Sequence, residues 1–369
     1  MTDDPRLTAL ARSLPASVPF VGPEAMTRAR GRPFAARLGA NESAFGPSPR
    51  AIEAMQRAAT EAWMYADPEN HDLRHAIADH HGIRPEEVMV GEGIDTLLGV
   101  TVRLFVDPGT PVVTSAGAYP TFNYHVAGFG GTLHTVPYTG DLEDPARLMA
   151  KAAEVGARLI YLANPDNPMG SFHGAETIAR AISAVPEGAL LILDEAYADL
   201  APQDEVPDLD PTDARVLRYR TFSKAHGLAG ARVGYVIGPE PLLSAFNKVR
   251  NHFGINRIAQ AGALAAIRDT GWLDHVRAEV AAARSRIAAA ALDQGLTPLP
   301  SAANFVAIDC GQDGAVARRV LTALAEEDVF VRMPFVAPQD RCIRVSCGPQ
   351  EMTDLFAAAL PRALAAARA

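Results

Sequence analysis

A regular alternation of short apolar runs with helical patterns limits the folds open to this chain more than any other feature of its sequence. From about residue 88 the runs read VMVG, PVVTS, RLIYLAN, GALLILDEAY, RVLRYRTFS and ARVGYVIG. They are largely apolar throughout rather than at every second position, which is typical of strands buried on both faces. Because helical segments separate them, the sequence predicts an α/β fold with a mostly parallel, doubly wound sheet.

The two ends of the chain follow a different pattern. Residues 1–37 are predicted to form an N-terminal arm with one helical patch, and PSPRAIEAMQRAATEAW predicts a helix that begins near Ser48. Beyond the last apolar run, a long helical pattern at 271–295 precedes the strand patterns NFVAIDC and CIRVSCG and two further helices. We therefore expect a large domain over 38–265 and a smaller α+β domain over 266–369, which the arm joins.

Charge and cysteine content argue against several classes of function. The chain has 369 residues and a formal net charge of −9, and it contains no block of lysine and arginine that would bind a nucleic acid. Its three cysteines, Cys310, Cys342 and Cys347, form no CxxC pair, so we expect neither a disulfide framework nor a metal site. No apolar run approaches the roughly 18 residues of a membrane helix, and the N-terminus is acidic where a signal peptide would be basic. These features favour a cytoplasmic protein that binds neither nucleic acid nor membrane.

Polar side chains gather after four of the strand patterns, where ligands bind in sheets of this kind. The first cluster is GEGIDT at 91–96. It combines glycines with the start of a helix, whose backbone N–H groups and dipole suit a phosphate. Asp95 and Thr96 lie in the first turn of that helix. A tight turn that merely caps the helix is the alternative, and position 96 lacks the third glycine of a dinucleotide site.

The second and third clusters follow later strand patterns. NPDNPMG at 164–170 contains two Asn-Pro turns, which make a rigid loop that could hold Asn167 over a ligand, although a plain turn is the alternative. In LILDEAYADL, Asp194 ends a buried strand, where a carboxylate is costly unless it is paired. Asp194 therefore either caps the next helix or faces a cationic partner. Tyr197 follows three residues later, near the same face of a helix.

The fourth cluster, TFSKAHGLAGAR at 221–232, places one lysine, Lys224, among small, apolar and hydroxyl residues. Thr221 and Ser223 offer hydroxyl groups, and Arg232 offers a planar fork for an anion. A lysine without charged neighbours can act as a nucleophilic amine, for example in forming a Schiff base. The alternative is a surface lysine whose stem covers apolar groups.

Together the clusters offer phosphate-binding groups, a carboxylate, an amide, a phenol and a lysine, and pyridoxal phosphate uses all of them. With these motifs the sequence resembles the fold-type I aminotransferases, and among them the group similar to histidinol-phosphate aminotransferase. The resemblance runs from about residue 19 to the end and rests on LGANESAFGPSP, NPDNPMG, LDEAYADL, TFSKAHGLAGARVG and CIRVSCG. It implies that 38–265 is a cofactor-binding domain. It also implies a ping-pong exchange of an amino group between an amine or amino acid and a 2-oxo acid.

The resemblance implies roles for individual residues around pyridoxal phosphate. Lys224 would form the Schiff base and move the proton, and Asp194 would pair with the pyridinium nitrogen. Asn167 and Tyr197 would donate hydrogen bonds to the ring hydroxyl oxygen. The residues implied to hold the cofactor phosphate are Ile94 through its backbone, Asp95, Thr96, Thr221, Ser223 and Arg232.

Two aromatic residues also receive roles from the resemblance. Phe122, in YPTFNYH, would stack on the cofactor ring; it is alternatively a core residue, and Tyr119 or Tyr124 could take its place. Tyr65, in YADPE, would reach the cofactor phosphate of a neighbouring subunit, which implies a homodimer with shared active sites. The alternative for Tyr65 is an aromatic residue at a helix end.

On the substrate side, Arg344 in CIRVSCG would clamp a carboxylate with its planar fork. Asn41 and Asn304 would be polar groups near the substrate or at the domain contact, or they stabilise turns. Arg332 matches an arginine that the family places near a substrate phosphate, whereas Phe20, in VPFVGPE, stands where the family usually has a tyrosine. We expect a substrate that is histidinol-phosphate-like or aromatic.

Two other functions use the same motifs. A decarboxylase of the threonine-phosphate decarboxylase type would hold the same cofactor, because the orientation of the substrate decides which bond breaks. A non-catalytic, cofactor-sensing module would need a DNA-binding head, for which residues 1–40 are too short and insufficiently basic. The sequence thus favours an aminotransferase.

Overall fold

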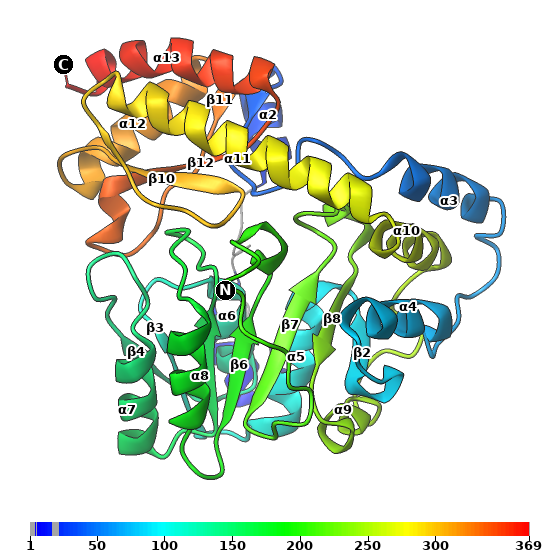
Figure 1. Ribbon diagram of the computed structural model, residues 1–369. Helices are drawn as coiled ribbons and strands as arrows, with labels where there is room; N and C mark the ends of the chain where they lie inside the picture. Colours follow the sequence, from blue (N-terminus) through cyan, green and yellow to red (C-terminus); the bar gives the residue numbers. More distant parts are fainter. Residues whose placement is uncertain (1–3, 5, 17–21, 369) are drawn as a thin grey trace.

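A seven-stranded sheet forms the centre of the protein in the computed structural model, which describes residues 4, 6–16 and 22–368 (Figure 1). Its strands lie in the order β2-β8-β7-β6-β5-β3-β4. Of these, β8 alone runs antiparallel to its neighbours, β2 and β7. The strands are β2 Val88–Gly91, β3 Pro111–Ser115, β4 Thr132–Val136, β5 Leu159–Ala163, β6 Leu190–Asp194, β7 Val216–Thr221 and β8 Gly234–Ile237. The predicted α/β class with a mostly parallel sheet is therefore confirmed.

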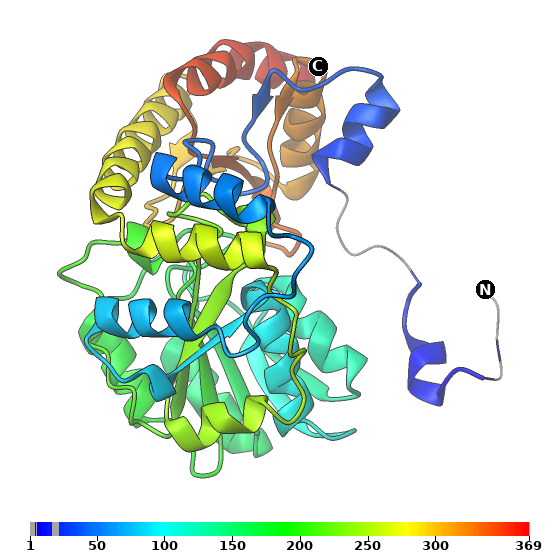
Figure 2. The same ribbon diagram turned by 90° about the vertical axis from the view of Figure 1, so that its right-hand side faces the viewer.

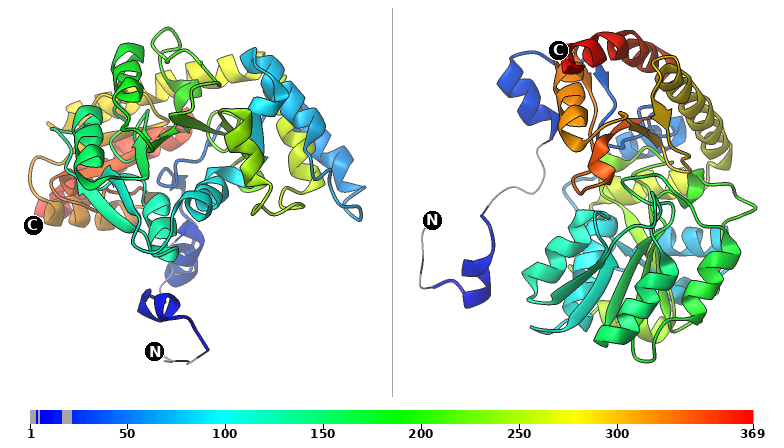
Figure 3. Two further views of the ribbon diagram at one scale, coloured as in Figure 1. Left: turned by 90° about the horizontal axis from the view of Figure 1, so that it is seen from below. Right: turned by 90° about the vertical axis from the view of Figure 1, so that its left-hand side faces the viewer.

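Both faces of this sheet are buried, which explains the continuous apolar runs. Successive strand residues alternate between two apolar clusters: Val112 and Ile192 pack into one, and Val113 and Leu191 pack into the other. Helices α5, α6 and α9 cover the first face and α7 and α8 cover the second, as two further views show (Figure 3). These helices are α5 Gly93–Phe105, α6 Pro120–Gly128, α7 Pro145–Val155, α8 Ala175–Ser183 and α9 Glu240–Phe246.

Three more helices pack against β2 and β8 at one edge of the sheet. They are α3 Pro49–Ala59, α4 His71–His81 and α10 Arg257–Ile267. The start of α3 lies where the sequence predicts it. Ser48 accepts a hydrogen bond from the N–H of Ala51 at 3.0 Å, and proline occupies the first helical position.

The C-terminal part of the chain forms a second unit above the carboxyl ends of the parallel strands (Figure 1). Its antiparallel sheet has the order β12-β10-β9, and β1 pairs in parallel with β11. The elements are β1 Ala36–Arg37, α11 Thr270–Leu292, β9 Thr297–Pro298, β10 Phe305–Asp309, α12 Gly314–Glu326, β11 Val329–Phe330, β12 Cys342–Ser346 and α13 Gln350–Arg368. Ala36 and Leu38 join the apolar core of this unit. The beginning of the chain therefore contributes to its C-terminal unit, while the exact domain limits remain a prediction.

The remaining helices are short. Near the N-terminus lie α1 Ala9–Ser13 and α2 Pro23–Arg30, and α2 sits beside the C-terminal unit, where Arg30 pairs with Asp328 (Figure 2). The 3₁₀ helices are η1 Pro85–Glu87, η2 Ala198–Leu200, η3 Ala229–Ala231 and η4 Gln339–Arg341. None of the described helices combines the length and apolar character needed to cross a membrane.

Candidate active site

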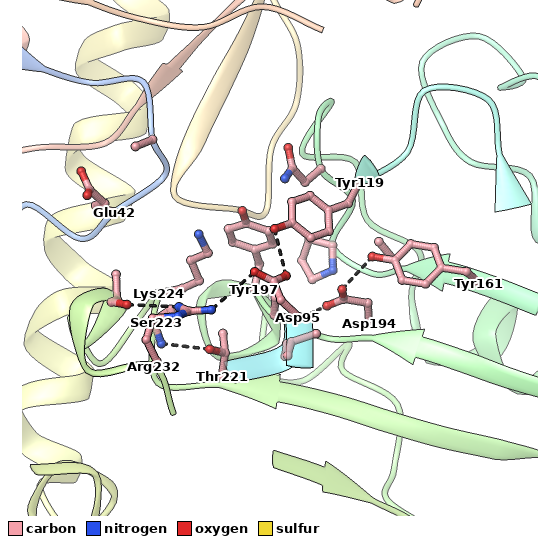
Figure 4. A pocket seen from close by; sticks show the side chains of 17 residues that line it. Glu42, Asp95, Tyr119, Tyr161, Asp194, Tyr197, Thr221, Ser223, Lys224 and Arg232 are labelled. Atoms are coloured by element: carbon pink, nitrogen blue, oxygen red, sulfur yellow. Dashed lines mark hydrogen bonds and ion pairs between the residues drawn. The ribbon is translucent and has the colours of Figure 1, made fainter. Parts of the chain in front are cut away.

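A cavity of about 250 Å³ lies where the carboxyl ends of β5, β6 and β7 meet the segment that follows β1 (Figure 4). All four polar clusters singled out in the sequence contribute to it. The register explains why, because Ala163 pairs with Asp194 and Asp194 with Tyr219, so the loops leave these strands at the same edge. Its lining residues are Ala40, Glu42, Ile94, Asp95, Tyr119, Tyr161, Ala163, Pro165, Asn167, Asp194, Ala196, Tyr197, Thr221, Ser223, Lys224, Ala229 and Arg232.

Lys224 reaches this cavity from the loop that follows β7. Its Nζ donates a hydrogen bond to the carbonyl oxygen of Asn41 at 3.0 Å and lies 5.4 Å from the centre of the Tyr197 ring. The neighbours of Lys224 in sequence are neutral, but those in space are not, since Asp194 lies close enough to interact with its charge. The fold thus places one primary amine among polar groups that converge from separate loops.

Asp194 ends β6, and its carboxyl group faces the cavity (Figure 4). One oxygen accepts a hydrogen bond from the hydroxyl of Tyr161 at 2.7 Å, and the other accepts one from the N–H of Ala196 at 3.0 Å, which caps the following turn. Burial raises the pKa of Asp194 to about 6, although these two hydrogen bonds and the charge of Lys224 oppose the rise. A cationic group in the cavity would stabilise the ionised carboxylate.

Hydroxyl and guanidinium groups gather at another side of the cavity (Figure 4). Arg232 donates to the hydroxyl of Ser223 at 3.3 Å, and Thr221 lies beside them at the end of β7. The first residue of α5, Gly93, has a φ of +79°, and a Cβ atom there would come within 2.6 Å of the Arg232 guanidinium. The missing side chain lets Arg232 approach the N-terminus of α5, where Ile94 lines the cavity. This arrangement suits a phosphate.

Asp95 and Thr96 of α5 occupy different positions. Asp95 lines the cavity and accepts hydrogen bonds from Tyr119 at 3.0 Å and from Arg232 at 3.4 Å. Thr96 does not line the cavity, which corrects its predicted place in the phosphate cup. Helix residues are about 100° apart around the axis, so Thr96 lies about 200° from Ile94 and on the far side of the helix.

Tyr119 lines the cavity, whereas Phe122 does not reach it. The Phe122 side chain is fully buried in the core, where its ring stacks on that of Tyr161 with centres 4.8 Å apart. Tyr119 precedes the first residue of α6, so its ring projects into the cavity, while the helix turns Phe122 toward the sheet. The prediction that Phe122 contacts the ligand is corrected in favour of its competitor Tyr119; Tyr124 is 58% exposed.

Asn41 joins the cavity to the C-terminal unit. Its side-chain amide donates to the hydroxyl of Tyr197 at 3.0 Å, and its carbonyl accepts from Lys224 at 3.0 Å and from Asn304 at 3.2 Å. Its side-chain oxygen accepts from the hydroxyl of Ser346, at the end of β12, at 3.0 Å. The backbone of Asn41 adopts a φ of 53°, which asparagine tolerates better than most residues. Asn41 and Asn304 therefore lie behind the cavity wall and hold its residues in place.

Arg344 lies half-buried beside the cavity. Its Nη1 donates to the side-chain oxygen of Asn167, its Nη2 donates to the carbonyl of Gly39 at 3.3 Å, and its Nε has no hydrogen-bond partner. No acidic side chain of the described residues forms an ion pair with it, and burial lowers its pKa. The backbones of Arg344 and Arg332 pair as a β-bridge, so the two arginines are adjacent. This unsatisfied guanidinium suits an external carboxylate.

Two other predicted residues lie outside this arrangement. Tyr65 does not line the cavity of its own chain; its side chain is 79% exposed and packs against the ring of Phe253, with centres 4.8 Å apart. Phe20 lies outside the described residues, so the structure does not place it.

Sequence reasoning missed Tyr161 and Glu42, which both line the cavity. Tyr161 carried a signal, because a hydroxyl in the otherwise apolar run RLIYLAN needs a buried partner, and that partner is Asp194. Glu42 follows Asn41 in a stretch that offered no comparable signal. Within the described residues, no group of three or more His, Cys, Asp and Glu side chains could hold a metal ion.

Comparison with known proteins identifies the family. The family described as aminotransferase class I and II matches residues 36–360. The chain belongs to this family. This aminotransferase is 53% identical to the histidinol-phosphate aminotransferase from Sinorhizobium meliloti, solved in complex with pyridoxal-5'-phosphate, with a TM-score of 0.95 over 98% of each chain.

Curated relatives give the same result. The chain is 34% identical to histidinol-phosphate aminotransferase 1 of Mesorhizobium japonicum over 89% of this chain and 90% of the relative. It is also 34% identical to histidinol-phosphate aminotransferase of Anaeromyxobacter sp. strain Fw109-5, over 96% and 98% respectively. The predicted fold type and the predicted aminotransferase reaction are thus confirmed, and a decarboxylase is not favoured.

The cofactor of this family is pyridoxal phosphate, as predicted from the sequence motifs. The donors in the cavity fit that molecule. Lys224 supplies an amine, the buried Asp194 suits a cationic ring nitrogen, and the space left by Gly93 lets Arg232 approach an anion at the N-terminus of α5.

Proposed function

We propose that this aminotransferase takes its amino group from a histidinol-phosphate-like donor and delivers it to a 2-oxo acid. The observation that carries the proposal is the 53% identity and TM-score of 0.95 to a histidinol-phosphate aminotransferase over nearly the full length of both chains. Aromatic amino acids, which share a planar side chain with the imidazole donor, are the second candidate class.

In this proposal Lys224 binds the cofactor covalently through Nζ, and Asp194 pairs with its ring nitrogen. Pyridoxal phosphate, when bound, supplies an electron sink for the charge that develops at the substrate carbon. Asp194 keeps the ring nitrogen protonated, because an adjacent carboxylate favours the cationic form. The residues assigned to the cofactor phosphate are Ile94 and Asp95 through their backbone N–H groups, Thr221, Ser223 and Arg232.

The hydrogen bonds around Asn167 and Tyr197 support their role as donors to the ring hydroxyl oxygen. The side-chain oxygen of Asn167 already accepts from Arg344, which leaves its NH₂ group to donate. The hydroxyl of Tyr197 accepts from the amide of Asn41, which leaves its own hydrogen to donate. Both side chains are therefore oriented before the cofactor binds.

The same geometry supports distinct roles for the lysine and the two arginines during the reaction. Lys224 Nζ moves the proton at the substrate's α-carbon, and the carbonyl of Asn41 holds the amine near the cavity. Arg344 binds the carboxylate of the 2-oxo acid, since its Nε lacks a partner and the guanidinium fork matches a carboxylate. Arg332, its neighbour across the β-bridge, contributes to the phosphate of the donor.

The test of the donor is an absorbance titration of the purified protein loaded with pyridoxal phosphate. L-histidinol phosphate should convert the visible band of the lysine-bound cofactor into that of the amine form. L-histidinol, which lacks the phosphate, is the matched control and should act far more weakly. Equal conversion by both compounds would refute recognition of the phosphate, and no conversion by either would refute this donor and direct the search to aromatic amino acids.

We further propose that the enzyme is a homodimer in which Tyr65 reaches the cofactor phosphate of the neighbouring subunit. The support is the exposure of Tyr65 together with that of Phe253, against which it packs, and of Trp63, which is 83% exposed. Such a set of exposed aromatic rings is typical of a protein interface.

Mixing two inactive variants tests this arrangement. In a mixed dimer of Lys224→Ala and Tyr65→Ala subunits, one site would carry both defects and the other neither, so activity should reappear on mixing. No recovery, in a sample shown to contain mixed dimers, would overturn the role of Tyr65 across the interface.

A cytoplasmic location completes the proposal. The three cysteines are free and buried, which is compatible with a reducing compartment. Fractionation of cells that express the tagged protein is the direct test.

A further inference from the structure

Two carboxyl groups lie buried together behind the loop that carries Asn167. Glu143, just before α7, and Asp166, in the loop after β5, are each 1% exposed. The charge of Asp166 acts on Glu143, so the two carboxyl groups are neighbours. None of the roles proposed for the active site uses either residue.

Each carboxyl group also binds other segments. Glu143 accepts hydrogen bonds from the hydroxyl of Ser115 at 2.5 Å and from the N–H of Ala163 at 3.1 Å, at the ends of β3 and β5. Asp166 accepts from the hydroxyl of Tyr138 at 3.0 Å and from the N–H of Met169 at 3.0 Å. The pair therefore ties loop 164–170 to the edge of the sheet.

The surroundings do not neutralise two negative charges. No lysine, arginine or histidine of the described residues forms an ion pair with Glu143 or Asp166 in the structure. Arg344 acts on Asp166 through its charge alone. The other titratable groups that face the pair are the phenols of Tyr138 and Tyr161, whose pKa values burial raises, and the ring of His173, which contacts the backbone carbonyl of Glu143 at 2.8 Å.

Two neighbouring carboxylates that are buried without a cation repel each other, so one of them should hold a proton, which it can donate to the other. We propose that Glu143 and Asp166 share one proton and thereby hold loop 164–170, so that Asn167 stays in contact with Arg344 beside the cavity. They act as positioning residues. Asp166 precedes Asn167 in the chain, so a displacement of its carboxyl group would move the amide that Arg344 contacts.

The pair should hold loop 164–170 less firmly as pH rises. Burial raises the pKa of Glu143 well above its usual range, and the nearby charge of Asp166 raises it further. Burial likewise raises the pKa of Asp166 to about 6. An acid whose pKa is higher in the folded than in the unfolded protein makes stability fall as pH rises from the unfolded value toward the folded one. The shared proton should therefore be lost, and the loop released, on the alkaline side.

The experiment compares Asp166→Asn with the wild type. The amide has the shape of the acid and can donate to Glu143 without a titratable proton. The melting temperature of the variant relative to the wild type should rise by several degrees between about pH 5 and about pH 8. A difference that stays constant or falls with pH would overturn the shared proton. Glu143→Gln, if Asp166→Asn fails to fold, should show the same trend.

Asp144→Asn is a matched control at the neighbouring position. Hydrogen bonds from Arg147 and Thr139 outweigh the effect of burial and lower the pKa of Asp144. Its folded-state pKa therefore lies below the unfolded one, so Asp144 is ionised in both states above about pH 5, and the melting temperature of this variant relative to the wild type should stay level over the same pH range. A rise in both variants would show that the trend is not specific to the pair.

A second readout tests the link to the active site, and this part rests on the proposed function of Arg344. The wild-type KM for the 2-oxo acid should rise with pH as the loop is released, whereas that of Asp166→Asn should stay level. A stability trend in the expected direction with identical KM profiles would overturn the positioning role while leaving the shared proton intact. The stability measurement does not depend on which substrate the enzyme uses.

Discussion

Replacing Arg344 with lysine tests the chemistry of its half-buried guanidinium directly. Arg344 donates to Asn167 and Gly39, but its Nε has no partner and no acidic side chain of the described residues pairs with it. Lysine keeps the positive charge and a similar length. It lacks the planar fork, however, and so cannot form two parallel hydrogen bonds to one carboxylate.

The expected loss follows from one missing charge-assisted hydrogen bond. Such a bond contributes about 1.5–3 kcal/mol. Since 1.36 kcal/mol corresponds to a factor of ten, kcat/KM for the 2-oxo acid should fall by about 10-fold to about 150-fold. The loss should fall mainly on KM, because the carboxylate is present in the bound substrate as well as in the transition state.

The assay is the second half-reaction in isolation. Protein converted to its amine form is mixed with a 2-oxo acid such as 2-oxoglutarate, and the return of the visible band is followed against substrate concentration. Arg341→Lys is the matched control. Arg341 lies near the start of the same strand, but the carboxylates of Asp141 and Asp309 already satisfy it, at 2.9 Å and 2.7 Å.

An unchanged KM in Arg344→Lys, with the fold intact, would refute the assignment of Arg344 to the carboxylate. An equal loss in Arg341→Lys would show that the effect comes from disturbing the C-terminal unit rather than from the fork. The reasoning holds only if Arg344→Lys is impaired and Arg341→Lys is not.

Three further predictions concern single charged groups. Lys224→Ala should abolish turnover and the visible band of the bound cofactor while leaving the melting temperature of the ligand-free protein nearly unchanged, since Lys224 makes one hydrogen bond, to a backbone carbonyl. Asp194→Asn should bind the cofactor more weakly by spectroscopic titration. In the ligand-free wild type, the raised pKa of Asp194 should lower the free energy of unfolding by about 3 kcal/mol as pH rises from about 4 to about 6. Asp194→Asn, which has no titratable group at this position, should not show this fall. Glu195→Ala leaves two buried arginines without their shared carboxylate and should cost about 3–5 kcal/mol in urea unfolding, whereas Glu53→Ala, which breaks an exposed pair, should cost less than about 1 kcal/mol.

The fold was largely predictable because strands that are buried on both faces appear in the sequence as continuous apolar runs. The strands at 305–309 and 342–346 lie within the predicted patterns, and the helix expected over 271–295 spans Thr270–Leu292. The sequence did not reveal β4, Thr132–Val136, because this edge strand is partly exposed and mixes threonine and histidine with apolar residues. Strands of two residues, such as β1, leave too short a pattern to detect.

The sequence predicted those site residues that stand in a loop fixed by a motif. It did not predict the residues whose place in the cavity depends on the direction in which a helix turns its side chains, or on contacts between distant segments. The family resemblance assigned roles to Thr96 and Phe122, but one turn of α5 and one turn of α6 direct these side chains away from the cavity. The pairing of Glu143 with Asp166 depends on where two loops meet in space. The aspartate at position 166 acquires a physical meaning only once Glu143 is seen beside it.

The cavity depends on the contact between the two parts of the chain, and Asn41 is the residue through which that contact acts. It binds Lys224 and Tyr197 on the cofactor side and Ser346 and Asn304 on the side of the C-terminal unit. Any movement of the C-terminal unit against the large sheet must therefore change the hydrogen bonds of the reactive amine or of the phenol. Arg344 lies on the same strand as Ser346, so a shift of this strand would also reach Asn41.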